Sequence, residues 1–213
     1  MSIQLIRAFG PTIAKIKIPN EMVKALNDYV DGLIIDKKKS KELSAGANLA
    51  GDVTQEFKLE KEFSQKVGWL DLISKGVFQW IQMSTNQSIK EFKMIDSWIV
   101  RQFQNEYNPV HMHGGHVSGA GFLKVPKTFG KYVQEEKDGV KHYAGGTLNL
   151  IHGSKQFLSK STFQIRPEVG DFYFFPNYMM HTVYPFTDSD EERRSISFNA
   201  KIDDNIYDAY GNY

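Results

Sequence analysis

Residues 108–116 read NPVHMHGGH and carry three histidines, at positions 111, 113 and 116. If this segment ends a β-strand, side chains two positions apart point to the same side, so His111 and His113 would be close together while Met112 points away. Two imidazoles in this arrangement can bind one metal ion as neighbouring ligands. The two glycines that follow His113 would let the chain turn tightly and leave room beside the metal.

A third histidine later in the chain adds to this prediction. His181 lies between two runs of strand-forming residues, at 171–176 and 182–186, so a sheet could bring it to the other two. Each histidine taken alone has an ordinary alternative as a buried, hydrogen-bonded packing residue. A further alternative is that only one of His111 and His113 binds the metal, while the other, or His116, orients a ligand; His116 could also complete the site in place of His113.

Polar residues also alternate along the segment 193–199, which reads RRSISFN. The two-residue period of a strand puts Arg193, Ser195, Ser197 and Asn199 on one face and Ile196 with Phe198 on the other. A guanidinium fork beside a hydroxyl matches a carboxylate, whereas an unpaired buried arginine is costly. We therefore predict that Arg193 and Ser195 bind a carboxylate. A slip of one residue would exchange Arg193 for Arg194, and a solvated outer face is the other interpretation.

The sequence around these motifs predicts the fold class. After about residue 91, short runs rich in Val, Ile and aromatic residues alternate with Gly, Pro, Asn and Asp, which is typical of an antiparallel sandwich or barrel. Before that point, apolar residues at helical spacing predict one helix behind an Asn20 cap and a second, longer one over 60–85. Alternation predicts an edge strand over 13–18, and the polar stretch 36–52 is expected to be a solvated loop.

These elements predict an α+β protein whose core is a double-stranded β-helix, of the jelly-roll or cupin-like kind, with the N-terminal helices packed on one face. The length of 213 residues and the hydrophobic content of 41% suffice for one buried core. We expect a single domain over 1–213. Within it, residues 1–94 would be mainly helical support, 95–201 would form the β-helix core, and 202–213 would be a tail that docks or frays.

Charge and composition exclude several kinds of partner and site. The 26 basic and 25 acidic side chains leave a net charge of +1, so no general attraction to nucleic acid or to anionic membranes is expected. With no cysteine, there can be neither a disulfide nor a thiolate metal site. The lack of a long apolar run or a signal-peptide pattern predicts a cytoplasmic protein with no membrane span. An edge strand near the N-terminus makes a homodimer reasonable.

In this order and spacing, the motifs resemble those of the Fe(II)/2-oxoglutarate oxygenase superfamily, and most closely its small prolyl-hydroxylase-like branch found in bacteria and phages. The resemblance covers most of the chain after residue 95, namely the strand of Trp98 and the segments 108–126, 145–150, 167–176, 181–185 and 193–199. It implies Fe(II) bound by His111, His113 and His181. It also implies that 2-oxoglutarate chelates the metal while Arg193 and Ser195 hold the distal carboxylate of this cosubstrate.

Such an enzyme uses O2 to hydroxylate a peptide or small-molecule substrate and releases succinate and CO2; a prolyl residue is the first substrate that the resemblance suggests. One position departs from the superfamily's usual pattern. Most members supply His-x-Asp or His-x-Glu, whereas His113 is the second residue here, and no Asp or Glu occurs between residues 107 and 134. Three neutral imidazoles would leave the charge of Fe(II) to be cancelled by the dianionic cosubstrate.

Two other functions compete with this one. The first is a three-His cupin-type metalloenzyme without a keto-acid cosubstrate, which shares the fold and the histidines but has no use for an inward Arg193. The second is a non-catalytic jelly-roll binding module, in which the histidines are incidental. Stoichiometric Fe(II) binding and the use of 2-oxoglutarate would separate the three.

Overall fold

The computed structural model describes residues 2–6, 10–45, 51–127 and 145–211. The larger of two antiparallel sheets contains, in spatial order, β1 (Ile3–Ile6), β2 (Ile13–Lys17), β9 (Asp171–Pro176), β6 (Val117–Lys124), β11 (Arg193–Ile202), β4 (Phe92–Gln102) and β3 (Gln55–Lys58). The smaller sheet contains β5 (Asn108–His111), β10 (Met180–Val183), β7 (Leu148–Ile151) and β8 (Thr162–Ile165). The helices are α1 (Asn20–Ile35), α2 (Lys37–Glu42), α3 (Lys61–Lys66), α4 (Trp69–Thr85) and α5 (Asp204–Gly211).

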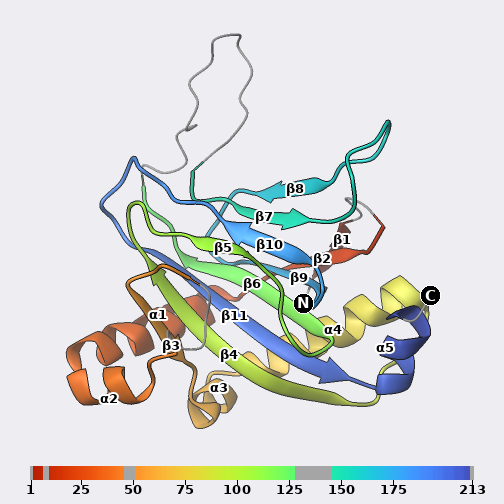
Figure 1. The fold of residues 1–213 in the computed structure, drawn as a ribbon. Helices are drawn as coiled ribbons and strands as arrows, with labels where there is room; N and C mark the ends of the chain where they lie inside the picture. Colours follow the sequence, from red (N-terminus) through yellow and green to blue (C-terminus); the bar gives the residue numbers. More distant parts are fainter. Residues whose placement is uncertain (1, 7–9, 46–50, 128–144, 212–213) are drawn as a thin grey trace.

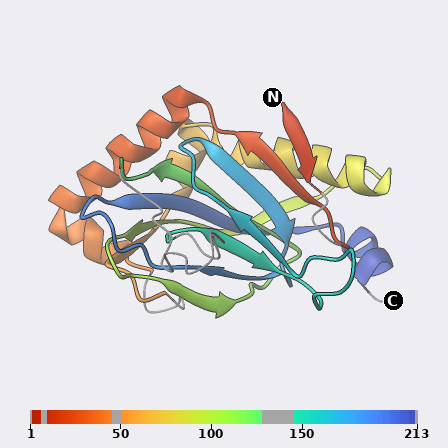
Figure 2. The same ribbon diagram turned by 90° about the horizontal axis from the view of Figure 1, so that it is seen from above.

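The two sheets face each other, and helices α1, α3 and α4 lie on the far side of the larger sheet from the smaller one (Figure 1). Seen from above, α1 in red-orange and α4 in yellow flank the N-terminal strands (Figure 2). This architecture confirms the predicted double-stranded β-helix with helices on one face. Among the helices that the structure describes, none is long and apolar enough to cross a bilayer.

Strand alternation divides the apolar side chains of the larger sheet between two cores. Phe172 and Phe174 of β9 point toward the helices, where Trp69 of α4 meets Phe172 edge-on with the ring centroids 5.3 Å apart. Tyr173 and Phe175 of the same strand point into the space between the sheets. Burying each such side chain contributes about 1.5–3 kcal/mol. The helix-side core therefore supports the larger sheet, while the inner core leaves one end of the space between the sheets for polar groups.

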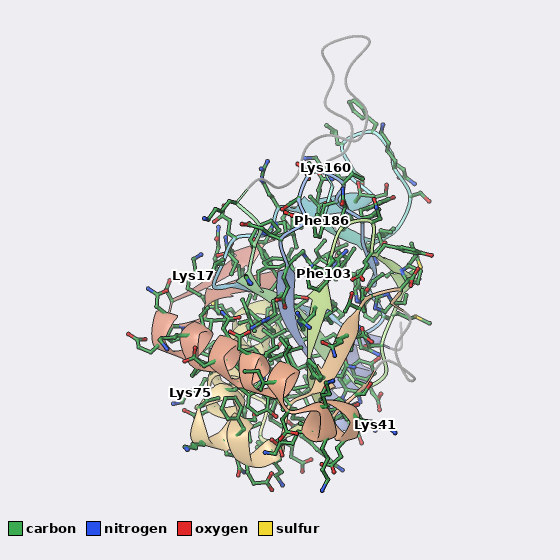
Figure 3. The ribbon with its side chains drawn as sticks, turned by 90° about the vertical axis from the view of Figure 1, so that its left-hand side faces the viewer. Lys17, Lys41, Lys75, Phe103, Lys160 and Phe186 are labelled. Atoms are coloured by element: carbon green, nitrogen blue, oxygen red, sulfur yellow. The ribbon has the colours of Figure 1, made fainter. Side chains whose placement is uncertain are left out.

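Two features of the first third differ from the prediction. The expected single helix over 60–85 is two helices, α3 and α4, because Gly68 between them adopts a left-handed backbone conformation with φ of 77°. The stretch 36–52, expected to be a loop, contains α2, whose first turn is capped by the Asp36 carboxylate accepting two backbone N–H groups. The lysines of this stretch are nevertheless solvated, as Figure 3 shows for Lys41.

Three smaller differences concern the place of β2 in the sheet, the start of α1 and the strand β3. The strand over 13–17 is not at an edge, because β2 pairs with both β1 and β9. Asn20 is the first residue of α1, and Pro19 occupies the cap position without a side-chain bond. The short strand β3 was not predicted, and it extends the larger sheet beyond β4. The tail folds as α5, which packs against β11 and the residues that follow β5.

Candidate metal centre

His111 and His181 lie directly opposite each other on paired strands. His111 ends β5, and its register partner on β10 is His181. His113 lies just beyond β5, where its backbone N–H donates to the carbonyl of Asn177 at 3.1 Å. All three imidazoles line one cavity between the two sheets. The fold thus brings together the histidines that the sequence singled out, although two of them are separated by 68 positions along the chain.

The three imidazoles converge on one point. The ring centroids of His111 and His181 are 4.2 Å apart, and each lies 4.9 Å from that of His113. Each ring contributes one nitrogen atom, and these three nitrogens all lie within 4.8 Å of one another. The Nε2 atoms of His113 and His181 are 3.1 Å apart. In the part of the chain that the structure describes, no Asp or Glu joins this group.

Backbone carbonyls orient two of the rings. Nδ1 of His111 lies 2.7 Å from the carbonyl of Pro109, and Nδ1 of His181 lies 2.9 Å from that of Met179. We assign Nδ1–H as the donor in both, which leaves the Nε2 lone pairs free to bind a cation. Burial lowers the pKa of His181 to about 3 and that of His113 to about 4, with the neighbouring imidazoles adding to the effect. The rings of His113 and His181 are therefore neutral near pH 7, as nitrogen ligands of Fe(II) must be.

The polar face of β11 lines the same cavity. Arg193, Ser195 and Ser197 point into it, as the alternation along the strand predicts. Arg193 is 2% exposed; its Nη1 donates to Oε1 of Gln102 at 2.8 Å, and its guanidinium carbon lies 5.2 Å from the centre of the Phe122 ring. Burial lowers the pKa of Arg193 to about 10, which still leaves the group charged at neutral pH.

Arg193 lacks an anionic partner among the described residues, and its Nε has no hydrogen-bond acceptor there. A buried guanidinium without a counter-ion costs several kcal/mol. A carboxylate placed in the cavity would remove this cost, because two parallel N–H groups of a guanidinium match the two oxygens of a carboxylate. The chemistry of the cavity therefore fits a metal chelator that carries a second, distal carboxylate.

The adjacent Arg194 faces the opposite side of the sheet. Its Nε lies 2.8 Å from Oε1 of Glu192, and its Nη2 lies 2.7 Å from Oδ1 of Asp31 on α1. Asn27 accepts from it as well, at 3.0 Å. Of the two neighbouring arginines, only Arg193 is placed to meet a ligand in the cavity.

His116 lies apart from the three converging histidines. Its ring stacks on Tyr207 of α5 with centroids 4.0 Å apart, its Nδ1 lies 3.1 Å from the carbonyl of Ile202, and its Nε2 lies 3.5 Å from Oδ1 of Asp204. The structure therefore brings His113, and not His116, to His111 and His181.

Tyr207 is linked to His113 of the candidate metal centre by hydrogen bonds through the side chain of Asn177. Its hydroxyl donates to Oδ1 of Asn177 at 3.2 Å, and Nδ2 of Asn177 donates to the carbonyl of His113 at 3.3 Å. We expect Tyr207→Phe to weaken Mn²⁺ binding by several-fold, less than the roughly 10- to 100-fold that follows loss of a direct partner of a metal ligand. Isothermal titration calorimetry measures this. Tyr29→Phe, whose hydroxyl binds Glu60 far from the cavity, is the control; equal losses in the two variants would contradict the role of Tyr207.

Sequence reasoning did not single out two of the residues that line the cavity. Trp98 meets His113 edge-on with centroids 5.5 Å apart, and Gln102 holds Arg193 in place. Trp98 and Gln102 are each two positions from Val100 along β4, so all three side chains point to the same side of the sheet. Knowledge that β4 pairs with β11 would have placed them at the cavity. That pairing follows from the tertiary structure and not from local sequence.

Comparison with known proteins agrees with this geometry. Residues 96–199 match a protein-family model described as "Putative 2OG-Fe(II) oxygenase", whereas a search of curated proteins found no match. The fold is similar to that of the viral collagen prolyl hydroxylase of Paramecium Bursaria Chlorella virus-1, solved as its 2OG complex, with 16% identity over 88% of this chain and 94% of that one and a TM-score of 0.55.

Two further solved structures are similar in fold. One is a prolyl-4-hydroxylase of Pseudomonas putida, with 13% identity over 89% of this chain and 91% of that one and a TM-score of 0.56. The other is HygX of Streptomyces hygroscopicus, solved with nickel and 2-oxoglutarate bound, with 10% identity over 89% and 82% of the two chains and a TM-score of 0.52. At these identities the likeness establishes the fold alone.

The family model spans the strands from β4 to β11 and so includes the three histidines and Arg193. The match agrees with the converging imidazoles and with the buried guanidinium that the cavity contains. Residues 96–199 are therefore similar to the putative 2OG-Fe(II) oxygenases over the part of the chain that carries the three converging histidines and Arg193.

Proposed function

We propose that this protein is a non-haem dioxygenase that uses Fe(II), 2-oxoglutarate and O2 to hydroxylate its substrate, with release of succinate and CO2. One observation carries the proposal. A single cavity joins three converging imidazoles with a buried guanidinium that has no anionic partner among the described residues. The first group of side chains suits a divalent cation and the second suits the far carboxylate of the keto acid.

The residues have separate roles in this proposal. His111, His113 and His181 would hold Fe(II), which when bound supplies the redox chemistry that couples decarboxylation of the keto acid to C–H oxidation. Arg193 would bind the distal carboxylate of 2-oxoglutarate, with the Ser195 hydroxyl as a second donor. Gln102 would keep the guanidinium in place through its 2.8 Å hydrogen bond. The remaining walls are largely apolar, which keeps water from competing for these polar groups.

The substrate would approach from an adjoining cleft, which shares Trp98 and His113 with the inner cavity. The side chains of Lys58, Asp96 and Asn199 make its lining polar. A polar cleft suits a peptide backbone, and two of the similar solved structures are prolyl hydroxylases by name. We propose a peptide substrate on this basis, with a prolyl residue as the first to be tested.

Succinate release tests the proposal. Protein reconstituted with Fe(II) in the presence of 2-oxoglutarate, ascorbate and a set of prolyl peptides is expected to form succinate, and omission of either Fe(II) or the peptides should lower the rate. Stoichiometric Fe(II) binding without any binding of 2-oxoglutarate would instead support the three-His cupin-type enzyme. Failure to bind Fe(II) at all would support the non-catalytic binding module.

A further inference from the structure

Glu56 is a buried carboxyl group that the proposed function leaves unused. It lies on β3, at the edge of the larger sheet, and is 2% exposed. Neither of its carboxyl oxygens has a hydrogen-bond partner among the residues that the structure describes. An isolated buried carboxylate is among the most costly groups in a protein interior, so its presence calls for a compensating interaction.

The register of the sheet places Glu56 beside the cavity. Its partner on β4 is Val100, which lines the cavity, and residues paired across antiparallel strands point to the same side. A Cβ added at Gly51 would lie 2.5 Å from Oδ1 of Asn108 and 3.4 Å from Oε1 of Glu56. Asn108 also lines the cavity, so the Glu56 carboxyl lies immediately behind this part of the wall.

Glu56 is not one of the candidate metal ligands. The metal-binding group of the described residues contains only imidazoles, and Glu56 does not belong to it. On the same face, the cationic side chains are Lys58, two positions along β3, and Arg193, two strands away on β11. No ion pair joins either of them to Glu56 in the described part of the chain. Burial raises the pKa of the Glu56 carboxyl to about 7, so a nearby cation would readily ionise it.

A charge count identifies what this carboxyl could balance. The three imidazoles that would hold the cation contribute no negative charge of their own. A divalent cation and Arg193 bring three positive charges into the cavity, whereas 2-oxoglutarate brings two negative ones. One positive charge is left over in a space of low dielectric constant, where an uncompensated charge is expensive.

We propose that Glu56 is an outer counter-ion of the metal centre, which supplies from behind the cavity wall the negative charge that the three-histidine ligand set lacks. The inference rests on the proposed function. Glu56 is a positioning residue in this role, because it acts on the bound cation through space and not as a ligand. Three features carry it: the burial of Glu56, its missing partner among the described residues, and its place beside two residues of the cavity wall.

Binding of Mn²⁺ and of 2-oxoglutarate to Glu56→Gln tests the proposal without an activity assay. We expect the Mn²⁺ dissociation constant to rise by about tenfold, because a cation has lost a nearby anion. We also expect the Mn²⁺-loaded variant to bind 2-oxoglutarate several-fold more tightly, because the dianion no longer meets a like charge. Damage to the fold would weaken both equilibria, so changes of opposite sign are specific to a counter-ion. Isothermal titration calorimetry measures both.

Two further variants complete the design. Glu56→Asp keeps the charge and should retain Mn²⁺ affinity within about threefold. Glu62→Gln removes one negative charge from an exposed position on α3 and should change neither constant. If wild type binds Mn²⁺ and His181→Ala does not, yet Glu56→Gln equals wild type, the counter-ion is refuted while the metal centre stands. If wild type binds no Mn²⁺, the proposed function fails and Glu56 has no cation to balance.

Discussion

His181→Ala is expected to lower Fe(II) or Mn²⁺ affinity by more than 100-fold and to abolish succinate release. Loss of an outer hydrogen-bond partner of a metal ligand already costs about 10- to 100-fold in affinity, and loss of the ligand itself costs more. His181 is the most buried of the three converging histidines, at 5% exposure, so water cannot easily take its place. Calorimetric titration of the metal-free protein with Mn²⁺ measures the first effect, and succinate analysis the second.

His113→Ala and His116→Ala form the matched comparison for this experiment. The two histidines are three positions apart, but only His113 faces His181, with their Nε2 atoms 3.1 Å apart. His113→Ala should therefore lose metal affinity as His181→Ala does, whereas His116→Ala should lose less than about tenfold, through its contact with Tyr207. A larger loss for His116→Ala than for His113→Ala would show that the ligand set is wrong.

Arg193→Met is expected to raise the KM for 2-oxoglutarate by about 30- to 3,000-fold, because removal of one partner from a buried, hydrogen-bonded charge pair costs roughly 2–5 kcal/mol. The same change should leave Mn²⁺ affinity within a few-fold of wild type. It should also keep or raise the free energy of unfolding of the ligand-free protein, since it removes a buried charge that has no counter-ion among the described residues. Steady-state kinetics and urea unfolding measure the two effects.

Arg194→Met gives the opposite pattern and is the control for Arg193→Met. Arg194 is 1% exposed and is paired with Glu192 and Asp31 on the helix side of the sheet. Its removal should lower the free energy of unfolding by about 3 kcal/mol, because the buried Glu192 loses a partner. The KM for 2-oxoglutarate should not change. A similar rise in KM for both variants would mean that general damage to β11, and not a carboxylate contact, explains the effect.

The fold class and the directions of the histidine and Arg193 side chains could be predicted because both depend on short-range periodicity. The period of two along 193–199 gives the side to which Arg193 points, and the spacing of His111 and His113 gives a shared face. The break at Gly68 was not predicted, because glycine inside a helical pattern is often tolerated and its left-handed conformation is set by how α3 and α4 pack. Helix α2 was missed because it has no buried residue, so no apolar period marks it.

The parts of the site that could not be predicted depend on contacts between distant segments. Glu56 lies in a short strand whose pairing with β4 is visible only in three dimensions, and in the sequence it is one of 25 acidic residues. Gln102 was one of several polar residues near the end of its strand, and only the pairing of β4 with β11 places it against Arg193. The residues that lie opposite a given side chain are set by how the strands pair in the sheet. The sequence of one strand alone therefore cannot predict them.

The register pairing of His111 with His181 couples metal binding to the cohesion of the smaller sheet. These two strands join through few residues, and helices α1, α3 and α4 lie on the far side of the larger sheet. An ion held by both imidazoles would act as a cross-link between β5 and β10, since whatever binds only the folded state stabilises it. Sliding either strand by one position would turn its histidine outward and break that link. Metal binding would therefore require the correct register between β5 and β10 and would stabilise that register over shifted ones.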